Sequence, residues 1–310
     1  MAKRAAPALA ERVLDLLEHK ATVLNIVHLP GVARRPGGDL ILCDVAREDA
    51  SVVLSELREI GIPEEGSIAV ETIDTSISAA ADAAEHAASG APADAVVWEE
   101  VESHTSESAE LSGSFLAFMI LATLIAGVGI LTDSVVLIIG AMVVGPEFGP
   151  LAGLCVALVQ RRSNLARRSF VALAVGFPVA IAATYVGTLL LRAGGRGPER
   201  LEEHPATLFI SSPDLFSLIV AVLAGVAGVL SLSTAKSGAL IGVLISVTTI
   251  PAAANVGVAA AYRDWAEFRG AAFQLGVNLI AILLSGATTL ALQRAFYVRR
   301  RRAARVTDHA

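Results

Sequence analysis

One carboxylate lies inside a long apolar stretch of this sequence. Glu147 belongs to the segment GPEFGP, at the middle of an otherwise uncharged run from Ser134 to Gln160. A carboxylate at such a depth in a membrane is costly, and by default it suggests a functional contact with a proton or a cation. The alternative is a position at a water-filled mouth with no specific role. We take Glu147 as a candidate binding residue for an ion or a solute.

The residues around Glu147 predict a broken helix. Proline and glycine leave backbone N–H and C=O groups without helical partners, and hydrocarbon cannot satisfy them. Such a break is tolerated where it is buried in protein or lines a polar cavity, and half-helix ends there present partial charges. A plain proline kink that helps packing is the alternative. Because two breaks match, we favour a site and add four candidates: Gly145, Pro146, Gly149 and Pro150.

A second apolar run, Ser237 to Tyr262, is also interrupted near its middle, by TTIPAAANVG. Its candidate binding residues are Thr248, Thr249, Pro251 and Asn255, and the last apolar run adds Asn278. Gln274 is a further polar group at depth. Most such groups bond across helices. We prefer Asn278 and the two threonines because they flank the second break or its neighbour.

These residues need membrane helices to position them, and the composition predicts such helices. Apolar residues make up 54% of the 310 positions and charged residues 17%, with a mean hydropathy of +0.64. Soluble domains carry about 25% charged residues, and a membrane helix needs about 20 apolar residues. We predict an α-helical polytopic membrane protein with six spans: 111–132, 134–160, 169–191, 215–235, 237–262 and 270–293.

The two halves of this region match when they are shifted by 101 positions. The matches include Pro150 on Pro251, Arg162 on Arg263, and Arg168 on Arg269. Three crossings in each unit would make the repeat inverted. Six crossings place the basic segment 161–168 on the same side as the arginine-rich tail, which the positive-inside rule prefers to re-entrant hairpins. We therefore expect an inverted 3+3 repeat, with two discontinuous helices and both termini cytoplasmic.

The N-terminal part predicts a small soluble domain. Helical spacing covers 9–19 and 48–60, and strand-like runs cover 22–28, 39–46 and 67–73, with a loop expected at 29–38. The order α-β-β-α-β is that of a ferredoxin-like fold without its first strand. We predict a cytoplasmic α+β domain at 1–75, a linker with an acidic pre-membrane helix at 76–111, the transmembrane domain at 112–298, and a basic cytoplasmic tail at 299–310. Trp98 is expected at an interface.

Several classes of function have no support in the residues. The two cysteines and six histidines show no metal-ligand spacing, so we expect no metal or cofactor. No nucleophile or Walker pattern indicates an enzyme, and nothing implies a nucleic-acid partner. The expected partners are the lipid bilayer, an unknown small solute or ion, and further copies of this chain, because so small a soluble domain buries little core.

The segment from Gly140 to Leu158, GAMVVGPEFGPLAGLCVAL, resembles the prokaryotic uncharacterised hydrophobic domain family, a domain-of-unknown-function family (389) marked by G-A-M-x-x-x-P-x-x-G-P. The similarity extends over about Asp94 to Ala291, through DAVVWEE, SSPDLFSLIVAVLAGVAG, IPAAANVGVA and Asn278-Leu279. It implies a prokaryotic inner-membrane protein with a small N-terminal α+β domain and no assigned activity. The chain departs from the family pattern at Glu147, which stands at a usually apolar position, at Ser217, and at Thr248–Pro251.

Two functions remain open from the residues. The first is a transporter or channel for a small solute or ion that uses the broken helices. The second is a membrane-anchored sensor or scaffold, whose α+β domain binds a ligand or a partner. A lipid-modifying enzyme is a distant third, because no nucleophile or metal set is present.

Overall fold

The computed structural model of the chain contains two compact units. The described residues up to Glu99 form the first unit, and most of those from Glu100 onward form the second. The structure describes residues 7–73, 77–88, 96–196, 198, 215–233 and 248–307. Within these ranges it leaves out the side chains of residues 7, 8, 100, 104 and 297–307.

The first unit packs two helices on one face of a hairpin. Its elements are α1 (Pro7–Glu18), β1 (Val23–Arg34), β2 (Gly37–Val45), α2 (Arg47–Glu59) and the one-turn α3 (Ile62–Glu65). The amphipathic spacing of the two long helices buries Val13, Leu17, Val53 and Leu57 together. Apolar residues of the strands, among them Ile26 and Ile41, pack against this cluster. The order α-β-β-α follows the sequence prediction.

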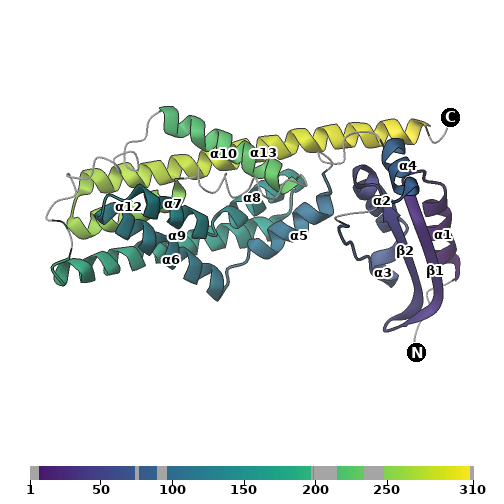
Figure 1. Cartoon of the computed structure of the whole chain (residues 1–310), viewed down its shortest axis with the longest axis horizontal. Helices are drawn as coiled ribbons and strands as arrows, with labels where there is room; N and C mark the ends of the chain where they lie inside the picture. The colour runs from purple at the N-terminus through teal and green to yellow at the C-terminus, as the bar shows by residue number, and fades with distance from the viewer. Residues whose placement is uncertain are drawn as a thin grey trace. The chain divides into compact units, whose positions relative to one another are not determined.

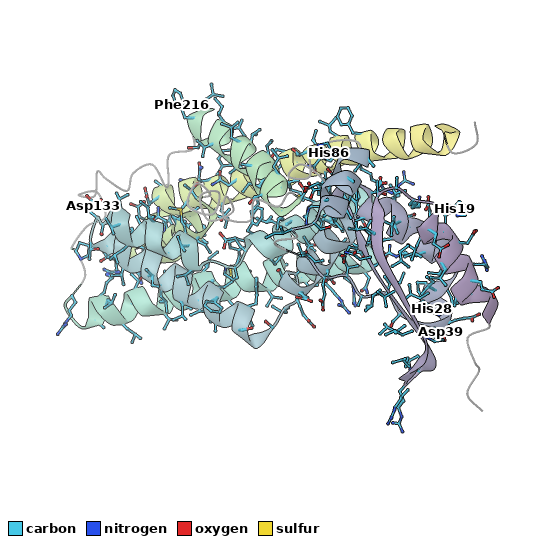
Figure 2. All side chains as sticks on the ribbon, turned by 45° about the vertical axis from the view of Figure 1, so that its right-hand side comes forward. His19, His28, Asp39, His86, Asp133 and Phe216 are labelled. Atoms are coloured by element: carbon cyan, nitrogen blue, oxygen red, sulfur yellow. The ribbon has the colours of Figure 1, made fainter. Side chains whose placement is uncertain are left out.

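The loop expected at 29–38 is mostly strand instead. β1 continues through Pro30 to Arg34, with an irregularity in the register between Leu29 and Ala33. Asp39 of β2 holds this stretch in place, because its Oδ2 lies 2.9 Å from His28 Nε2 and its Oδ1 accepts a 2.9 Å bond from the Gly31 amide (Figure 2). Glycine tolerates the positive φ of +68° at residue 31. The register shift between Leu29 and Ala33 therefore accommodates Pro30 and Gly31 within β1, where the sequence predicted a loop.

The strand predicted at 67–73 is wrong. These residues form no strand, and the sheet in the described part of the chain has two strands, β1 and β2. Ile68 reaches the core, whereas Val70 and Ile73 are exposed. Alternation of apolar and polar residues does not by itself form a strand, because a strand also needs a neighbouring strand to hydrogen-bond with it. A helix, α4 (Ala79–Ala87), follows in the segment expected to be linker or weak helix, and the Ser78 hydroxyl caps it.

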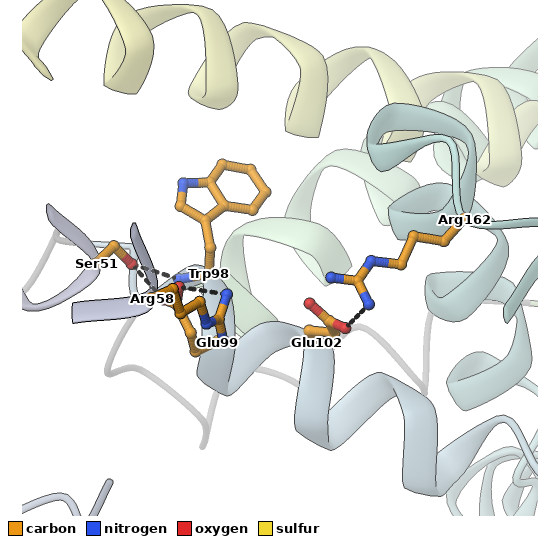
Figure 3. Close-up of polar contacts among 6 residues, drawn as sticks. All are labelled: Ser51, Arg58, Trp98, Glu99, Glu102 and Arg162. Carbon is orange, nitrogen blue, oxygen red and sulfur yellow. Dashed lines mark hydrogen bonds and ion pairs between the residues drawn. The ribbon is translucent and has the colours of Figure 1, made fainter. Parts of the chain in front are cut away.

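The acidic helix expected before the first span is α5 (Trp98–Ser108). Trp98 is buried rather than interfacial. In the first unit, the Trp98 amide donates to Ser51 Oγ at 2.9 Å, and the Ser51 hydroxyl donates to Glu99 at 2.7 Å (Figure 3). Arg58 lies 3.4 Å from the other oxygen of Glu99. A separate ion pair is drawn in the same figure for the second unit, between Glu102 and Arg162 at 2.5 Å.

The second unit is a bundle of apolar helices, so the chain is a helical membrane protein. Its helices are α6 (Gly113–Leu131), α7 (Val135–Val144), α8 (Phe148–Gln160), α9 (Ser163–Ala193), α10 (Leu215–Ser233), α12 (Thr249–Tyr262) and α13 (Trp265–Thr307) (Figure 1). Among the described residues, four helices are long and apolar enough to span a membrane: α6, α9, α10 and residues 265–296 of α13. The bent pair α7 and α8 adds one more candidate span.

The remaining predicted span, 237–262, is described only in its second half. This half is α12, which contacts α6, α7, α9 and α13 and is buried at nearly every position. A helix that is apolar all round belongs in the interior of a bundle. Residues 237–247 lie outside the described residues.

Side-chain contacts give the directions of the two short helices. Cys155 lies against the carbonyl of Leu283, and Arg294 donates to the carbonyl of Val159, so α8 runs parallel to α13. Asn278 of α13 reaches Thr248 and Glu267 reaches Asn255, so α12 runs antiparallel to α13. The helices α8 and α12 therefore run in opposite directions.

Candidate functional site

The first break has the position that the sequence predicts. α7 ends at Val144, α8 begins at Phe148, and their axes differ by 51°. Pro146 lies between the two helices. Pro150 is the third residue of α8, where the missing N–H costs nothing because the first-turn amides of a helix have no helical acceptor. The break therefore consists of Gly145, Pro146 and Glu147, and Pro150 belongs to the first turn of the next helix.

The second break is described only from Thr248 onward. Within the segment TTIPAAANVG, α12 begins at Thr249 and runs through all of its later residues, whereas residues 237–247 lie outside the described residues. Pro251 is the third residue of α12, as Pro150 is of α8. A proline in the first turn starts a helix instead of breaking one. Thr248 and Thr249 thus stand at a helix start, and Pro251 stabilises that start.

The two helix starts meet. Glu147 precedes the first residue of α8, and its Oε1 accepts a 2.7 Å hydrogen bond from the hydroxyl of Thr249, the first residue of α12. Glu147 is 3% exposed, and its Oε2 is buried without a hydrogen-bond partner among the described residues. A carboxylate and a hydroxyl about one hundred positions apart in the chain thus form one buried contact.

A second polar chain reaches the same helix start. Gln274 Nε2 donates to Asn278 Oδ1 at 3.1 Å, and Asn278 Nδ2 donates to Thr248 Oγ1 at 2.7 Å. Gln274 and Asn278 are buried, and Gln274 Oε1 lacks a partner within the described part of the chain. Gln274 was not among the predicted site residues. Its spacing of four positions from Asn278, which puts both on one helix face, is the signal that could have found it.

Asn255 does not belong to this cluster. Its Nδ2 donates to Glu267 at 2.8 Å, which ties the middle of α12 to the first turns of α13. Asn255 is buried, as expected for a polar group at depth. Its contact joins two helices away from their meeting point with α8, so we assign it to helix packing.

Two of the predicted glycines serve close packing. A Cβ on Gly145 would lie 2.7 Å from Ile250 Cγ1, so glycine lets the first break approach the first turn of α12. A Cβ on Gly149 would lie 2.6 Å from Ser108 Cβ at the end of α5. Gly145 therefore lies at the meeting point of the two breaks, whereas Gly149 faces away to α5.

The electrostatics of the meeting point follow from the helix starts. Each N-terminus carries roughly half a positive elementary charge, so two of them balance about one carboxylate. Neither Glu147 nor Thr248 caps its own helix through its side chain. The described residues of α6, α7, α8 and α10 contain no other acidic or basic side chain. The local arrangement thus pairs one buried carboxylate with two helix starts and several hydroxyl and amide groups.

Residues 142–284 match a family described as "Domain of unknown function (DUF389)". This part of the chain, just under half of its length, is similar to the DUF389 family. The DUF389 segment contains every predicted site residue, from Gly145 to Asn278, which agrees with the family resemblance of the sequence.

An archaeal protein is also similar to this chain. It is an uncharacterized protein of Methanocaldococcus jannaschii, 30% identical over 192 residues, and the match covers 61% of this chain and 57% of that protein. The chain therefore matches little more than half the length of this relative. No solved structure matches the chain. Neither the DUF389 description nor the description of this relative names an activity.

Proposed function

We propose that this protein is a transporter or channel for a small solute or ion, and not an enzyme, with its binding site where α8 and α12 begin. One observation carries the proposal: the buried Glu147 carboxylate joins the starts of two short helices through Thr249, with one oxygen unpaired among the described residues. Discontinuous helices that meet deep in a bundle are the usual construction of transporter binding sites.

We also propose an inverted repeat as the framework of this site. α10 begins 102 residues after α6, and α13 begins 102 residues after α9. The residue before α8 is Glu147 and the residue before α12 is Thr248, in matching positions relative to Pro150 and Pro251. The opposite directions of α8 and α12 support the inversion, because each copy of an inverted repeat points its half-helix the other way.

The repeat implies six crossings with both termini on the cytoplasmic side of a prokaryotic inner membrane. The basic segment 161–168 follows α8, and the arginine-rich end of the chain continues α13, which runs parallel to α8. These positive charges then share one side, as the positive-inside rule requires. Arg161 and Arg263, both with a positive φ near 60°, end α8 and α12 as equivalent residues. The equivalent of Arg263 is thus Arg161, one position before the match that the sequence suggested.

Self-association is a further proposal. The hairpin of the first unit exposes apolar residues: Val27, Leu29, Val32, Leu40 and Leu42. Solvent-exposed apolar residues on a sheet with open edges favour pairing with another copy. The mass of the detergent-purified full chain tests this proposal, and a monomer at micromolar concentration would contradict it.

Flux through proteoliposomes tests the proposed function. Purified chain is reconstituted, and the efflux of a panel of ions and neutral solutes is compared for the wild type and Glu147→Gln. We expect at least one solute to pass faster than through protein-free vesicles, with a rate that changes in Glu147→Gln. Glu267→Gln, a glutamate outside the meeting point, is the matched control. Uniform impermeability over a broad panel would rule out the proposal.

A further inference from the structure

The groups at the meeting point are mainly hydrogen-bond donors. In the first turns of α8 and α12, the amides of Phe148, Thr249 and Ile250 have no acceptors within their own helices. Pro150 and Pro251 have no N–H, and the Gly149 amide donates to the Pro146 carbonyl at 3.3 Å. Neither helix is capped by the side chain before it. The hydroxyl of Thr249 donates to Glu147. The hydroxyl of Thr248 accepts from Asn278, so its own proton is available to donate. Helix starts and hydroxyl donors are the groups that bind anions.

Oxygen acceptors for a cation are few at this point. Apart from Glu147 itself, Gln274 Oε1 is the one buried side-chain oxygen of the two polar chains that has no donor among the described residues. The positive ends of two helices repel a cation and attract an anion. The positive ends of α8 and α12 therefore favour a negative charge between them, and the Glu147 carboxylate supplies one.

The charged and titratable groups on the surrounding helices do not alter this balance. In the described residues that pack around α12, α6 and α7 contain none, and α8 contains Cys155, which lies against the Leu283 carbonyl. At the far end of α12 is Tyr262, with Arg192 of α9 over its ring, and Glu267 of α13 accepts a hydrogen bond from Asn255 in the middle of α12. The rest of α9, and α13 up to residue 296, add Arg167, Arg168, Tyr185, Arg269 and Arg294, and none of these described side chains bonds to Glu147. Glu147 is thus the only carboxyl group in contact with the two helix starts.

We propose that the substrate is a small inorganic or carboxylate anion, and that Glu147 is a tethered competitor that yields its place when it takes up a proton. This inference rests on the proposed function. The step balances as Glu147-COO⁻ plus H⁺ plus X⁻ going to Glu147-COOH with X⁻ bound. The proton goes to the carboxylate, and the anion takes over the donors at the helix starts. Binding of one anion therefore consumes one proton.

The Thr248 position supports this exchange. Thr248 stands before α12 as Glu147 stands before α8, yet it has no charge. The start of α12 thus has no carboxylate of its own and is joined to Glu147 by one hydrogen bond, which Glu147 Oε1 accepts from the Thr249 hydroxyl. Because one hydrogen bond holds the Glu147 carboxylate at the start of α12, an incoming anion can displace it.

Proton uptake on anion binding tests the inference on the intact wild-type chain. Sodium nitrate is added to the detergent-purified protein in a weak buffer, and the pH is recorded, with sodium gluconate as the large-anion control. We expect about one proton to be taken up for each nitrate bound. Glu147→Gln, which mimics the protonated carboxyl, should bind nitrate without proton uptake, whereas Glu267→Gln should behave as the wild type. Nitrate that binds with no proton uptake by the wild type would overturn the inference.

Flux separates this inference from the proposed function. Nitrate, chloride and formate efflux through the wild type should rise as the pH falls, by up to about tenfold per pH unit where the protonated fraction limits the rate. In Glu147→Gln the flux should be at least as fast and independent of pH. Flux of potassium or sodium that needs Glu147, with no anion flux, would overturn the anion assignment and leave transport intact. Impermeability to every solute would overturn both.

Discussion

The hydroxyl of Thr249 donates a 2.7 Å hydrogen bond to the Glu147 carboxylate, and this bond connects the first residue of α12 to the residue that precedes α8. Both residues are buried. Removing the donor leaves a buried carboxylate oxygen unpaired, so Thr249→Val should destabilise the protein by about 1–3 kcal/mol. Thr249→Ser retains the hydroxyl and should recover most of this loss. Thermal unfolding in detergent measures both, and equal midpoints for Val and Ser would contradict the contact.

Asn278 and Thr248 should be energetically coupled. Their 2.7 Å hydrogen bond joins α13 to the start of α12, and removing either side chain leaves the other without this partner. A double-mutant cycle of Asn278→Ala and Thr248→Val should give a coupling energy of about 0.6 kcal/mol, and up to about 1.7 kcal/mol, as found for polar pairs in membrane bundles. Asn255→Ala with Thr248→Val is the control cycle, because Asn255 bonds elsewhere. Strict additivity for the Asn278 pair would contradict the bond.

Gly257 should be intolerant of any side chain. A Cβ at this position would lie 2.7 Å from the Ile181 carbonyl oxygen, which is backbone of α9 and cannot rotate away. Gly257→Ala should therefore force α12 and α9 apart and destabilise the protein by about 1–3 kcal/mol. Gly276→Ala on α13 is the matched control, since nothing lies within 4 Å of its added Cβ. That variant should be neutral or stabilising, because alanine favours helix. Equal unfolding midpoints would be the contrary result.

Pro251 should be dispensable for the helix, because it occupies the first turn of α12. Pro251→Ala should change the stability by less than about 1 kcal/mol, since proline and alanine are both accepted there. Ala254→Pro, placed one turn further along the same buried helix, should cost about 3 kcal/mol or more. Unfolding midpoints compare the two variants. A large loss of stability in Pro251→Ala would contradict this explanation of the role of the proline.

The hairpin of the first unit should lose stability in acid. The hydrogen bond from His28 and that from the Gly31 amide lower the pKa of Asp39 below its ordinary value of 3.8. A carboxyl whose pKa is lower in the folded state stabilises the fold above its unfolded pKa, and that stabilisation is lost as the pH falls through the folded pKa. Amide exchange of β1 and β2, corrected for intrinsic rates, should therefore speed up below about pH 4.

Asp39→Asn provides the control for this pH dependence. The variant should exchange faster than the wild type at neutral pH and show little further change in acid, because it has no carboxyl group at position 39 to protonate. An acid dependence that is identical in the wild type and in Asp39→Asn would assign the effect to other groups.

Much of the helical part of the fold could be predicted from the sequence. The apolar runs that begin near Leu111, Ser169, Leu215 and Gly270 each overlap with one of the four described helices that can span a membrane. The first break at Gly145–Glu147 was also predicted, because proline and glycine change the backbone wherever they stand. These features depend on a segment and its immediate neighbours.

The strands were predicted less well. Residues 67–73 alternate as a strand does but form none, and residues 29–34 contain Pro30 and Gly31 yet continue β1. A strand exists only if another strand pairs with it, and the contacts of Asp39 across the hairpin decide the second case. Similarly, the sequence did not show that Pro251 lies in the first turn of α12, because the effect of a proline depends on where its helix begins.

The sequence by itself determined that this chain is a membrane protein and that one carboxylate, Glu147, lies within a long apolar segment, because transfer into hydrocarbon depends on the composition of each segment alone. Only the tertiary structure decided that this carboxylate meets Thr249, that Asn278 and Gln274 reach Thr248, and that Asn255 turns to Glu267. The physical reason is that hydrogen bonds deep in a bundle join residues far apart in the chain. Helix packing determines which polar groups meet, and the local pattern of residues does not predict that packing.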